Sequence, residues 1–341
     1  MTWFDESRLD DERALGAADL RLRTLAEAGA RVRRESTEVT EALDAAVSAA
    51  RDSRPRAVIA AGPDSRLLRA VLEPWCPVPF VAWPGPSLPG WAGGMDLVVV
   101  LAPEGDDPAT AAAVSEAVRR GCQVVVACPQ PSLVDQHAGG RWSTVLPSVA
   151  HDQLATAVVL LDYLHRVGLG PEADAESVAV ALDDVAVRCS PHRDLSVNPA
   201  KLLAISLADA NPLVWGGSVL AARAGRRVAE SVRRASGRAA LAGDAEHLLP
   251  VLEATPQRDV FDDPFAEGGA EHRPVLVVLD DGSDEPVTRA TERRLRETAD
   301  ARGVRVETVT SDAATEVGRY AQLLLTGTWA AEYLRLGLVD D

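Results

Sequence analysis

Residues 96–128, DLVVVLAPEGDDPATAAAVSEAVRRGCQVVVAC, carry the pattern that decides the fold. An apolar run at each end encloses a stretch of helix-forming residues. Asp107 precedes this stretch as an expected N-cap, Pro108 suits its first turn, and Gly121 follows its end. Strands that are apolar at nearly every position are typical of a parallel sheet buried on both faces. The segment therefore predicts a strand–helix–strand unit of an α/β protein.

The same pattern recurs on both sides of this segment. AVIAAG (57–62) and PVPFVAW (77–83) add strands before it. A second cycle begins with PLVWGGS (212–218), a long Ala/Arg helix and RPVLVVLDDG (273–282). We therefore expect two lobes, each a mostly parallel sheet flanked by helices. The predicted strands of these sheets include 57–62, 96–102, 122–127, 212–216, 274–280 and 304–309.

The chain of 341 residues is long enough for two domains of ordinary size. Apolar residues recur at helical spacing over 1–54, which predicts a helical N-terminal arm. We expect a first lobe over 55–150, bridging helices over 151–197 and a second lobe over 198–341. Residues 255–273 combine Pro, Gly and charge with little periodicity and are predicted to form a mobile loop.

Charge and hydropathy exclude several classes of partner. Fifty-one acidic residues against 35 basic ones give a net charge of −16. This balance disfavours nucleic acid and anionic membranes, because binding to both depends on cationic contacts with phosphate. The first residues lack the pattern of a signal peptide, and no apolar run reaches the length of a membrane span. We expect a cytoplasmic protein.

No metal and no cofactor are expected from the motifs. The cysteines lack zinc-ligand spacing and the histidines are scattered. The dinucleotide-binding, Walker and nucleophile-elbow patterns are all absent. LDDGSDE (279–285) does not fit a calcium loop and is interpreted as a solvated turn whose acids cap the next helix.

Two further segments carry a resemblance to a known family. NPAKLLAISLADANPLVWGGSVLAARAGRR (198–227) resembles the opening of the second sugar-isomerase (SIS) domain of bifunctional phosphoglucose/phosphomannose isomerases. GRYAQLLLTGTWAAEYLRLG (318–337) is similar to the last helix of that family. The resemblance implies two Rossmann-like SIS lobes and a homodimer. It also implies conversion of glucose-6-phosphate or mannose-6-phosphate to fructose-6-phosphate.

The first lobe departs from the hydroxyl-rich phosphate loops that the resemblance implies. In AAGPDSR (60–66), Gly62 and Ser65 remain as candidate substrate-binding residues. In the second loop, LAPEGDDPAT (101–110), carboxylates stand where hydroxyl groups are expected. Carboxylates repel a phosphate dianion, so we predict that this lobe does not bind phosphate tightly.

The turn WGGS (215–218) of the second lobe is a better-formed ligand loop. Gly216 and Gly217 permit a close approach of the backbone, and Ser218 offers both a helix N-cap and a hydroxyl group. Arg223 follows on the helix that this turn opens. The four residues are candidates for anion binding, although a tight turn followed by solvated arginines remains an alternative.

Aldose–ketose isomerisation needs a carboxylate to move a proton between carbons, and usually a histidine to open the sugar ring. The segment RASGRAALAGDAEHLLPVLEA (234–254) lacks the catalytic glutamate that the resemblance implies, and Glu246 and His247 are the remaining candidates. Two hypotheses stay open. One is a phosphosugar isomerase, and the other is a non-catalytic SIS-fold protein that binds a sugar phosphate or a protein partner as a regulator.

Overall fold

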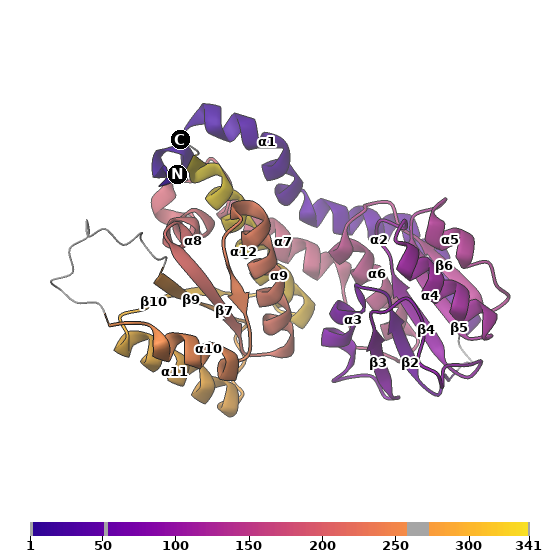
Figure 1. Ribbon diagram of the computed structural model, residues 1–341. Helices are drawn as coiled ribbons and strands as arrows, with labels where there is room; N and C mark the ends of the chain where they lie inside the picture. Colours follow the sequence, from indigo (N-terminus) through magenta and orange to yellow (C-terminus); the bar gives the residue numbers. More distant parts are fainter. Residues whose placement is uncertain (1–2, 51–53, 258–272, 340–341) are drawn as a thin grey trace. The chain divides into compact units, whose positions relative to one another are not determined.

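The computed structural model describes residues 3–50, 54–257 and 273–339 (Figure 1). It consists of two compact units, one of Met1–Glu27 with Ala181–Asp341 and the other of Ala28–Val180. These units divide the expected N-terminal arm after Glu27, and the predicted domain boundaries remain predictions.

Most of the loop predicted over 255–273 lies outside the described residues.

The unit Ala28–Val180 is built on a five-stranded sheet in which every pair of neighbours is parallel. Its order is β3-β2-β4-β5-β6. The strands are β2 (Val58–Ala61), β3 (Phe80–Trp83), β4 (Leu97–Leu101), β5 (Gln123–Cys128) and β6 (Ser143–Pro147). The strands predicted at 57–62, 96–102 and 122–127 are therefore confirmed, whereas β6 was not foreseen.

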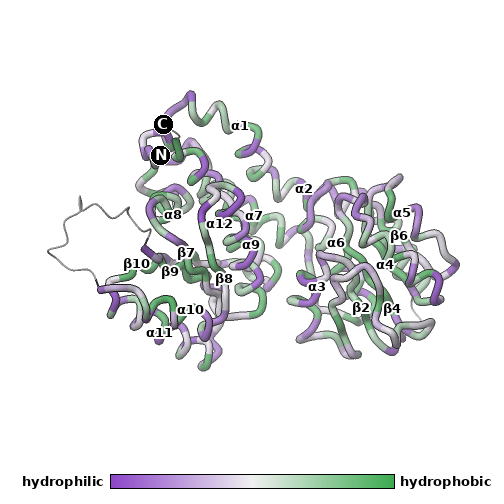
Figure 2. Tube along the Cα trace, in the orientation of Figure 1, coloured by the Kyte–Doolittle hydropathy of each residue, from purple (hydrophilic) through white to green (hydrophobic). Residues whose placement is uncertain are grey.

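Helices cover both faces of this sheet, and its central strand β4 is accordingly apolar and buried at every position; the hydropathy colouring shows the apolar interior of this unit (Figure 2). Helices α4 (Pro108–Arg119) and α5 (Leu133–His137) pack on one face. The other helices are α2 (Ala28–Ala50), α3 (Ser65–Leu72) and α6 (Gln153–Arg166), and α6 contacts α2, α3 and the sheet. Asp107 caps α4 as predicted, since its carboxylate accepts a hydrogen bond from the Thr110 amide.

The second sheet has the order β10-β9-β7-β8, and all of its strands are parallel. They are β7 (Ala210–Gly216), β8 (Leu241–Ala242), β9 (Arg273–Asp280) and β10 (Arg305–Thr310). The strands predicted in this half are confirmed, and the two-residue β8 was missed. Leu213 and Trp215 face α10 (Ala245–Ala254) and α11 (Pro286–Ala301), which form one layer.

The opposite layer of the second sheet consists of long helices that pack on one another. They are α8 (Pro199–Leu207), α9 (Val219–Ser236) and α12 (Glu316–Gly337). A Cβ atom on Gly327 of α12 would lie 2.3 Å from Val228 Cγ2 of α9, so glycine is required where these two helices cross. The predicted fold class, two mostly parallel sheets flanked by helices, is thus confirmed.

The remaining elements complete the helical content. Helices α1 (Glu12–Ala26) and α7 (Ala175–Arg188) and the short η1 (Glu6–Leu9) and η2 (Leu195–Val197) join the others. Strand β1 (Trp3–Phe4) pairs with β11 (Leu338–Val339) in antiparallel fashion. None of the helices in the described part of the chain combines the length and hydrophobicity needed to cross a membrane.

The cysteines are free thiols, and three of them are buried. Burial raises the pKa of Cys128 to about 11 and that of Cys189 to about 12, so both stay protonated and unreactive near neutrality. Only the half-buried Cys76 is partly accessible.

We therefore expect a disulfide reagent at about pH 8 to titrate one thiol in the native protein and all of them in denaturant. Reaction that persists in Cys76→Ser would contradict this expectation.

Candidate functional site

Each sheet has a switch point, at which the strand order reverses and neighbouring strands are reached on opposite sides of one strand. In the first sheet β2 leads through α3 to β3 on one side, while β4 lies on its other side. In the second sheet β7 leads to β8 on one side, while β9 lies on the other. Ligands of open α/β sheets bind at such switch points, beyond the carboxyl ends of the strands. The candidate crevices therefore lie between the loops that follow β2 and β4, and between those that follow β7 and β9.

The two loops of the first crevice meet at Gly62. This residue has a φ of +88°, and a Cβ atom on it would lie 3.0 Å from Thr110 Oγ1. Thr110 in turn donates from its hydroxyl group to the Asp107 carboxylate at 2.5 Å. The structure therefore brings Gly62 together with the acidic loop, and the hydroxyl group nearest to it is already bound to a carboxylate.

Ser65 opens α3 at the same crevice. Its side chain is fully buried, and its Oγ has no hydrogen-bond partner among the described residues. The neighbouring Asp64 accepts a hydrogen bond from the side-chain amide of Gln153. The two sequence candidates in this lobe, Gly62 and Ser65, thus lie in one turn, since the Ser65 amide donates to the Gly62 carbonyl at 3.1 Å.

Further titratable side chains lie at this edge of the sheet. Glu104 is largely exposed, and its carboxylate is 3.8 Å from Nδ1 of His151. His151 has a φ of +48°, which side-chain-bearing residues adopt at a cost. A phosphate dianion in this crevice would meet the carboxylates of Asp64, Glu104 and Asp107.

Ser218 of the second crevice makes two hydrogen bonds. As the N-cap of α9 its Oγ accepts from the Ala221 amide at 3.0 Å, as predicted. The same hydroxyl group donates to the carboxylate of Asp281, which directly follows β9. The prediction of a solvated turn over 279–285 holds for Glu285, which caps α11, but not for Asp281. Asp281 is thus a functional candidate that sequence reasoning missed, although its place after a strand of the same sheet was a usable signal.

The glycines of this turn serve packing. A Cβ atom on Gly216 would lie 2.3 Å from the backbone of Ala221, and one on Gly217 would lie 2.3 Å from Thr288 Cγ2. Both glycines therefore permit the close approach of neighbouring elements rather than of a ligand alone. Arg223 lies half-buried on the second turn of α9.

Arginine side chains hold the loop after β9. Arg319 donates to the Asp281 carbonyl at 3.3 Å. Arg289 lies 3.5 Å from the Asp280 carboxylate and 3.7 Å from that of Asp284, and the charge of Asp280 raises the pKa of Arg289. Arg289 and Arg319 thus already have carboxylate or carbonyl partners.

Glu246 and His247 both lie in the first turn of α10, and both are exposed. Because α10 follows β8, this turn lies at the same carboxyl edge of the sheet as Ser218. Neither side chain makes a hydrogen bond or ion pair within the part of the chain that the structure describes. The structure therefore does not link the two candidates to each other or to Ser218 through hydrogen bonds.

The N-P-A-K segment has a structural role. Asn198 caps α8 by accepting hydrogen bonds from the amides of Ala200 and Lys201. The Lys201 ammonium group is fully buried and donates to the Asp10 carboxylate at 2.5 Å. It also donates to the carbonyl groups of Pro191 and Arg193. This motif therefore ties the first residues of the chain to α8 and does not contact either crevice.

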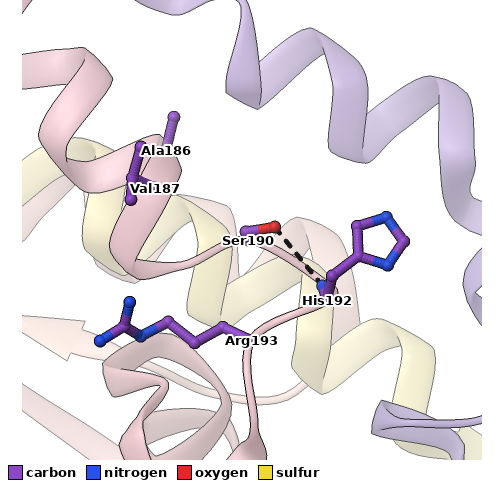
Figure 3. Close-up of a pocket in the computed structure, with 5 residues that line it drawn as sticks. All are labelled: Ala186, Val187, Ser190, His192 and Arg193. Atoms are coloured by element: carbon purple, nitrogen blue, oxygen red, sulfur yellow. Dashed lines mark hydrogen bonds between the residues drawn. The ribbon is translucent and has the colours of Figure 1, made fainter.

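A shallow, open pocket of about 550 Å³ lies at the C-terminal end of α7, and Figure 3 shows the residues that line it. His192 and Arg193 point in different directions there, and the His192 amide donates to Ser190 Oγ at 3.4 Å. The pocket lies beside the segment that Lys201 anchors, not at the end of a strand. Within residues 3–50, 54–257 and 273–339, no group of three His, Cys, Asp or Glu side chains is arranged to hold a metal ion.

Comparison with known families decides what kind of domain the second sheet forms. Residues 196–337 match the model of the bacterial phospho-glucose isomerase C-terminal SIS domain. Residues 196–337 are thus an SIS domain of the phosphoglucose isomerase type. The resemblance inferred from residues 198–227 and 318–337 is thereby confirmed for this domain. No curated protein sequence matches the chain significantly.

Solved structures share the fold of most of the chain. Tagatose-6-phosphate ketose/aldose isomerase from Escherichia coli aligns with a TM-score of 0.65 at 16% identity, over 92% of each chain. A glucose-6-phosphate isomerase like protein from Thermus thermophilus gives 0.53 at 20% identity, over 84% of this chain and 82% of that one. The C-terminal domain of glucosamine-fructose-6-phosphate aminotransferase from Francisella tularensis gives 0.59 at 12% identity, over 89% of this chain and 95% of that one. At these identities the likeness concerns the fold.

Proposed function

We propose that this SIS protein is a non-catalytic regulator that binds a carbohydrate derivative on a phosphosugar isomerase scaffold. One observation carries the proposal: in each crevice one hydroxyl group that could donate to a phosphate donates to an aspartate instead, while the Ser65 hydroxyl group of the first crevice has no partner among the described residues. Thr110 donates to Asp107 in the first crevice, and Ser218 donates to Asp281 in the second. A phosphate must displace these carboxylates or lie beside them, at a cost on the order of a few kcal/mol.

A phosphosugar isomerase is the second candidate function. It is favoured by the match of residues 196–337 and by the position of Glu246 and His247 at the carboxyl edge of the second sheet. A general base must come within hydrogen-bonding reach of the proton that it moves. Both side chains are exposed and could reach a sugar only if the ligand extends to the first turn of α10.

The two functions are separated by a coupled assay that measures conversion of glucose-6-phosphate and of mannose-6-phosphate to fructose-6-phosphate. We expect no turnover above the uncatalysed rate. Should turnover appear, Glu246→Gln and His247→Ala must abolish it, while Glu253→Gln, at the exposed far end of α10, must leave it unchanged. That outcome would replace the regulator with the isomerase.

Binding of the same sugars is expected to be weak. Dissociation constants from calorimetry should be no tighter than about 1 mM, or about −4 kcal/mol. Thermal stabilisation should therefore require sugar phosphate at millimolar concentration or above. Micromolar binding that Ser218→Ala and Arg223→Ala both weaken would assign a strong anion site to the second crevice. Micromolar binding abolished by Ser65→Ala would assign it to the first crevice, and stabilisation by no sugar phosphate would remove the carbohydrate ligand from the proposal.

We also propose that the protein is a homodimer, in keeping with the resemblance. Apolar side chains of the last helix, such as Leu323 and Trp329, are buried within their own unit and are not available for an interface. A dimer must therefore use other surfaces. Light scattering at micromolar concentration should give twice the mass of one chain, and the mass of a single chain would exclude the dimer.

A further inference from the structure

Three large apolar side chains are exposed at one edge of the first sheet. The exposed fractions are 50% for Trp91, 68% for Met95 and 57% for Trp142. Trp91 and Met95 lie in the segment that leads into β4, and Trp142 directly precedes β6. Since the strands are parallel, all three lie at the amino-terminal edge, opposite the crevice between β2 and β4. Clustered exposed apolar side chains mark interaction sites, whereas single ones do not.

The segment that displays Trp91 and Met95 is held firmly. The Arg56 guanidinium donates to the Asp96 carboxylate through two nitrogens, at 3.0 and 2.7 Å, and to the Trp91 carbonyl at 3.0 Å. Asp96 is fully buried and also accepts from the Gly93 amide. Arg120 donates to the Pro89 carbonyl at 2.8 Å. A surface fixed in this way loses little conformational entropy when a partner binds.

The same edge carries three arginines, of which Arg141 is exposed, while Arg56 and Arg120 pair with Asp96 and Glu116. The guanidinium of Arg56 lies 5.8 Å from the centre of the Trp91 ring, and that of Arg141 lies 4.7 Å from the Trp142 ring. Of the nearby carboxylates, Asp96 is buried beneath Arg56, and Glu116 pairs with two arginines. Tryptophan and arginine are the residues most enriched among those that dominate binding energy at protein interfaces. We call Arg56, Trp91, Met95, Arg120, Arg141 and Trp142 the tryptophan edge.

We propose that the tryptophan edge is a docking surface for an acidic polypeptide segment with aromatic or apolar side chains. A carboxylate of such a segment would pair with the exposed Arg141 while its apolar side chains cover the indole rings. This goes beyond the proposed function, because the surface lies at the opposite edge of the sheet from the ligand crevice.

Other occupants fit the surface less well. A two-fold contact with a second copy would place arginines against arginines, which repel one another. Nucleic acid and anionic membranes extend well beyond the Debye length of about 8–10 Å, so they also meet the net charge of −16. A short acidic segment meets only the local positive charge.

A short fluorescein-labelled copolymer of glutamate and tyrosine is a suitable probe, because it stays close to the local surface charge, and polyglutamate of the same length is the comparator. Anisotropy should report binding to the wild-type protein with a dissociation constant on the order of 10 µM. The double variant Trp91→Ala/Trp142→Ala should bind about tenfold more weakly, and Arg141→Gln about threefold more weakly. Trp3→Ala, which removes an exposed tryptophan from the other unit, should bind as the wild type does.

The proposal is overturned if the copolymer does not bind, if the double variant binds as tightly as the wild type, or if polyglutamate binds equally well. Tighter binding to single-stranded DNA or to vesicles containing phosphatidylglycerol would overturn it in favour of those partners. The replaced side chains are exposed, so the melting temperatures should stay unchanged and a loss of binding would not reflect unfolding. None of these outcomes bears on the isomerase assay, so this inference and the proposed function can fail separately.

Discussion

Lys201→Met is expected to lower the free energy of unfolding by about 3 kcal/mol, because it leaves buried acceptors without their donor. The ammonium group binds the Asp10 carboxylate and two backbone carbonyls, and it lies 5.7 Å from the centre of the Tyr333 ring. Methionine keeps most of the aliphatic stem, so the loss should reflect the polar contacts rather than a cavity. Denaturant unfolding followed by circular dichroism measures the change.

Two control variants show how much of the loss in unfolding free energy comes from the Lys201 ammonium group and how much from its ion pair with Asp10. Leu202→Ala changes an exposed neighbour on the same helix and should cost well under 1 kcal/mol. Asp10→Asn should cost about 1 kcal/mol, because Asp10 is half-exposed and Lys201 keeps its two carbonyl partners. If Lys201→Met unfolds at the same denaturant concentration as Leu202→Ala, the buried ammonium group does not anchor the first residues of the chain.

Glu35→Ala is expected to destabilise the unit Ala28–Val180 by about 4 kcal/mol. This buried carboxylate of α2 accepts hydrogen bonds from the amides of Val149 and Ala150, at 2.9 and 2.8 Å. It also accepts from the Thr156 hydroxyl at 3.0 Å. Alanine would leave both amides unpaired beside a small cavity, while the Thr156 hydroxyl group keeps the Ser148 hydroxyl group as a partner at 2.9 Å.

Hydrogen exchange gives a local readout of the same change. The amides of Val149 and Ala150 should exchange faster in Glu35→Ala than in the wild type, because their acceptor is gone. Glu35→Gln keeps one oxygen acceptor and should cost only about 1–2 kcal/mol. Glu38→Ala, at an exposed position of the same helix, is the matched control. Unchanged exchange at both amides in Glu35→Ala would show that the carboxylate does not hold the loop after β6.

The sequence predicted the features that depend on residues close together in the chain, namely helix caps and long strands. Asp107 and Ser218 were recognised as N-caps because capping joins a side chain to an amide three positions ahead. The long strands were recognised because burial on both faces leaves an unbroken apolar run. The strand β8 was missed because two residues carry no periodicity and become a strand only by pairing with β7.

The sequence predicted which residues lie at the candidate site, but it did not predict which residues they contact. Gly62, Ser65 and Ser218 lie in turns at the carboxyl ends of β2 and β7, as parallel strands require. The partner of Ser218 was not predicted, because Asp281 lies 63 positions further along the chain. Glu246 and His247 reach the same edge of the sheet, but the sequence could not tell that both side chains would be exposed.

The sequence alone therefore determined two parallel α/β lobes, their helix caps and a resemblance that residues 196–337 bear out. Only the tertiary structure decided the order of the strands, and with it which loops meet at a switch point. It also decided which charges are buried, since Glu35 and Lys201 look like ordinary helix-surface residues in the sequence. The physical reason is that caps and periodicity arise within a few residues, whereas strand order and buried charges depend on groups that only folding brings together.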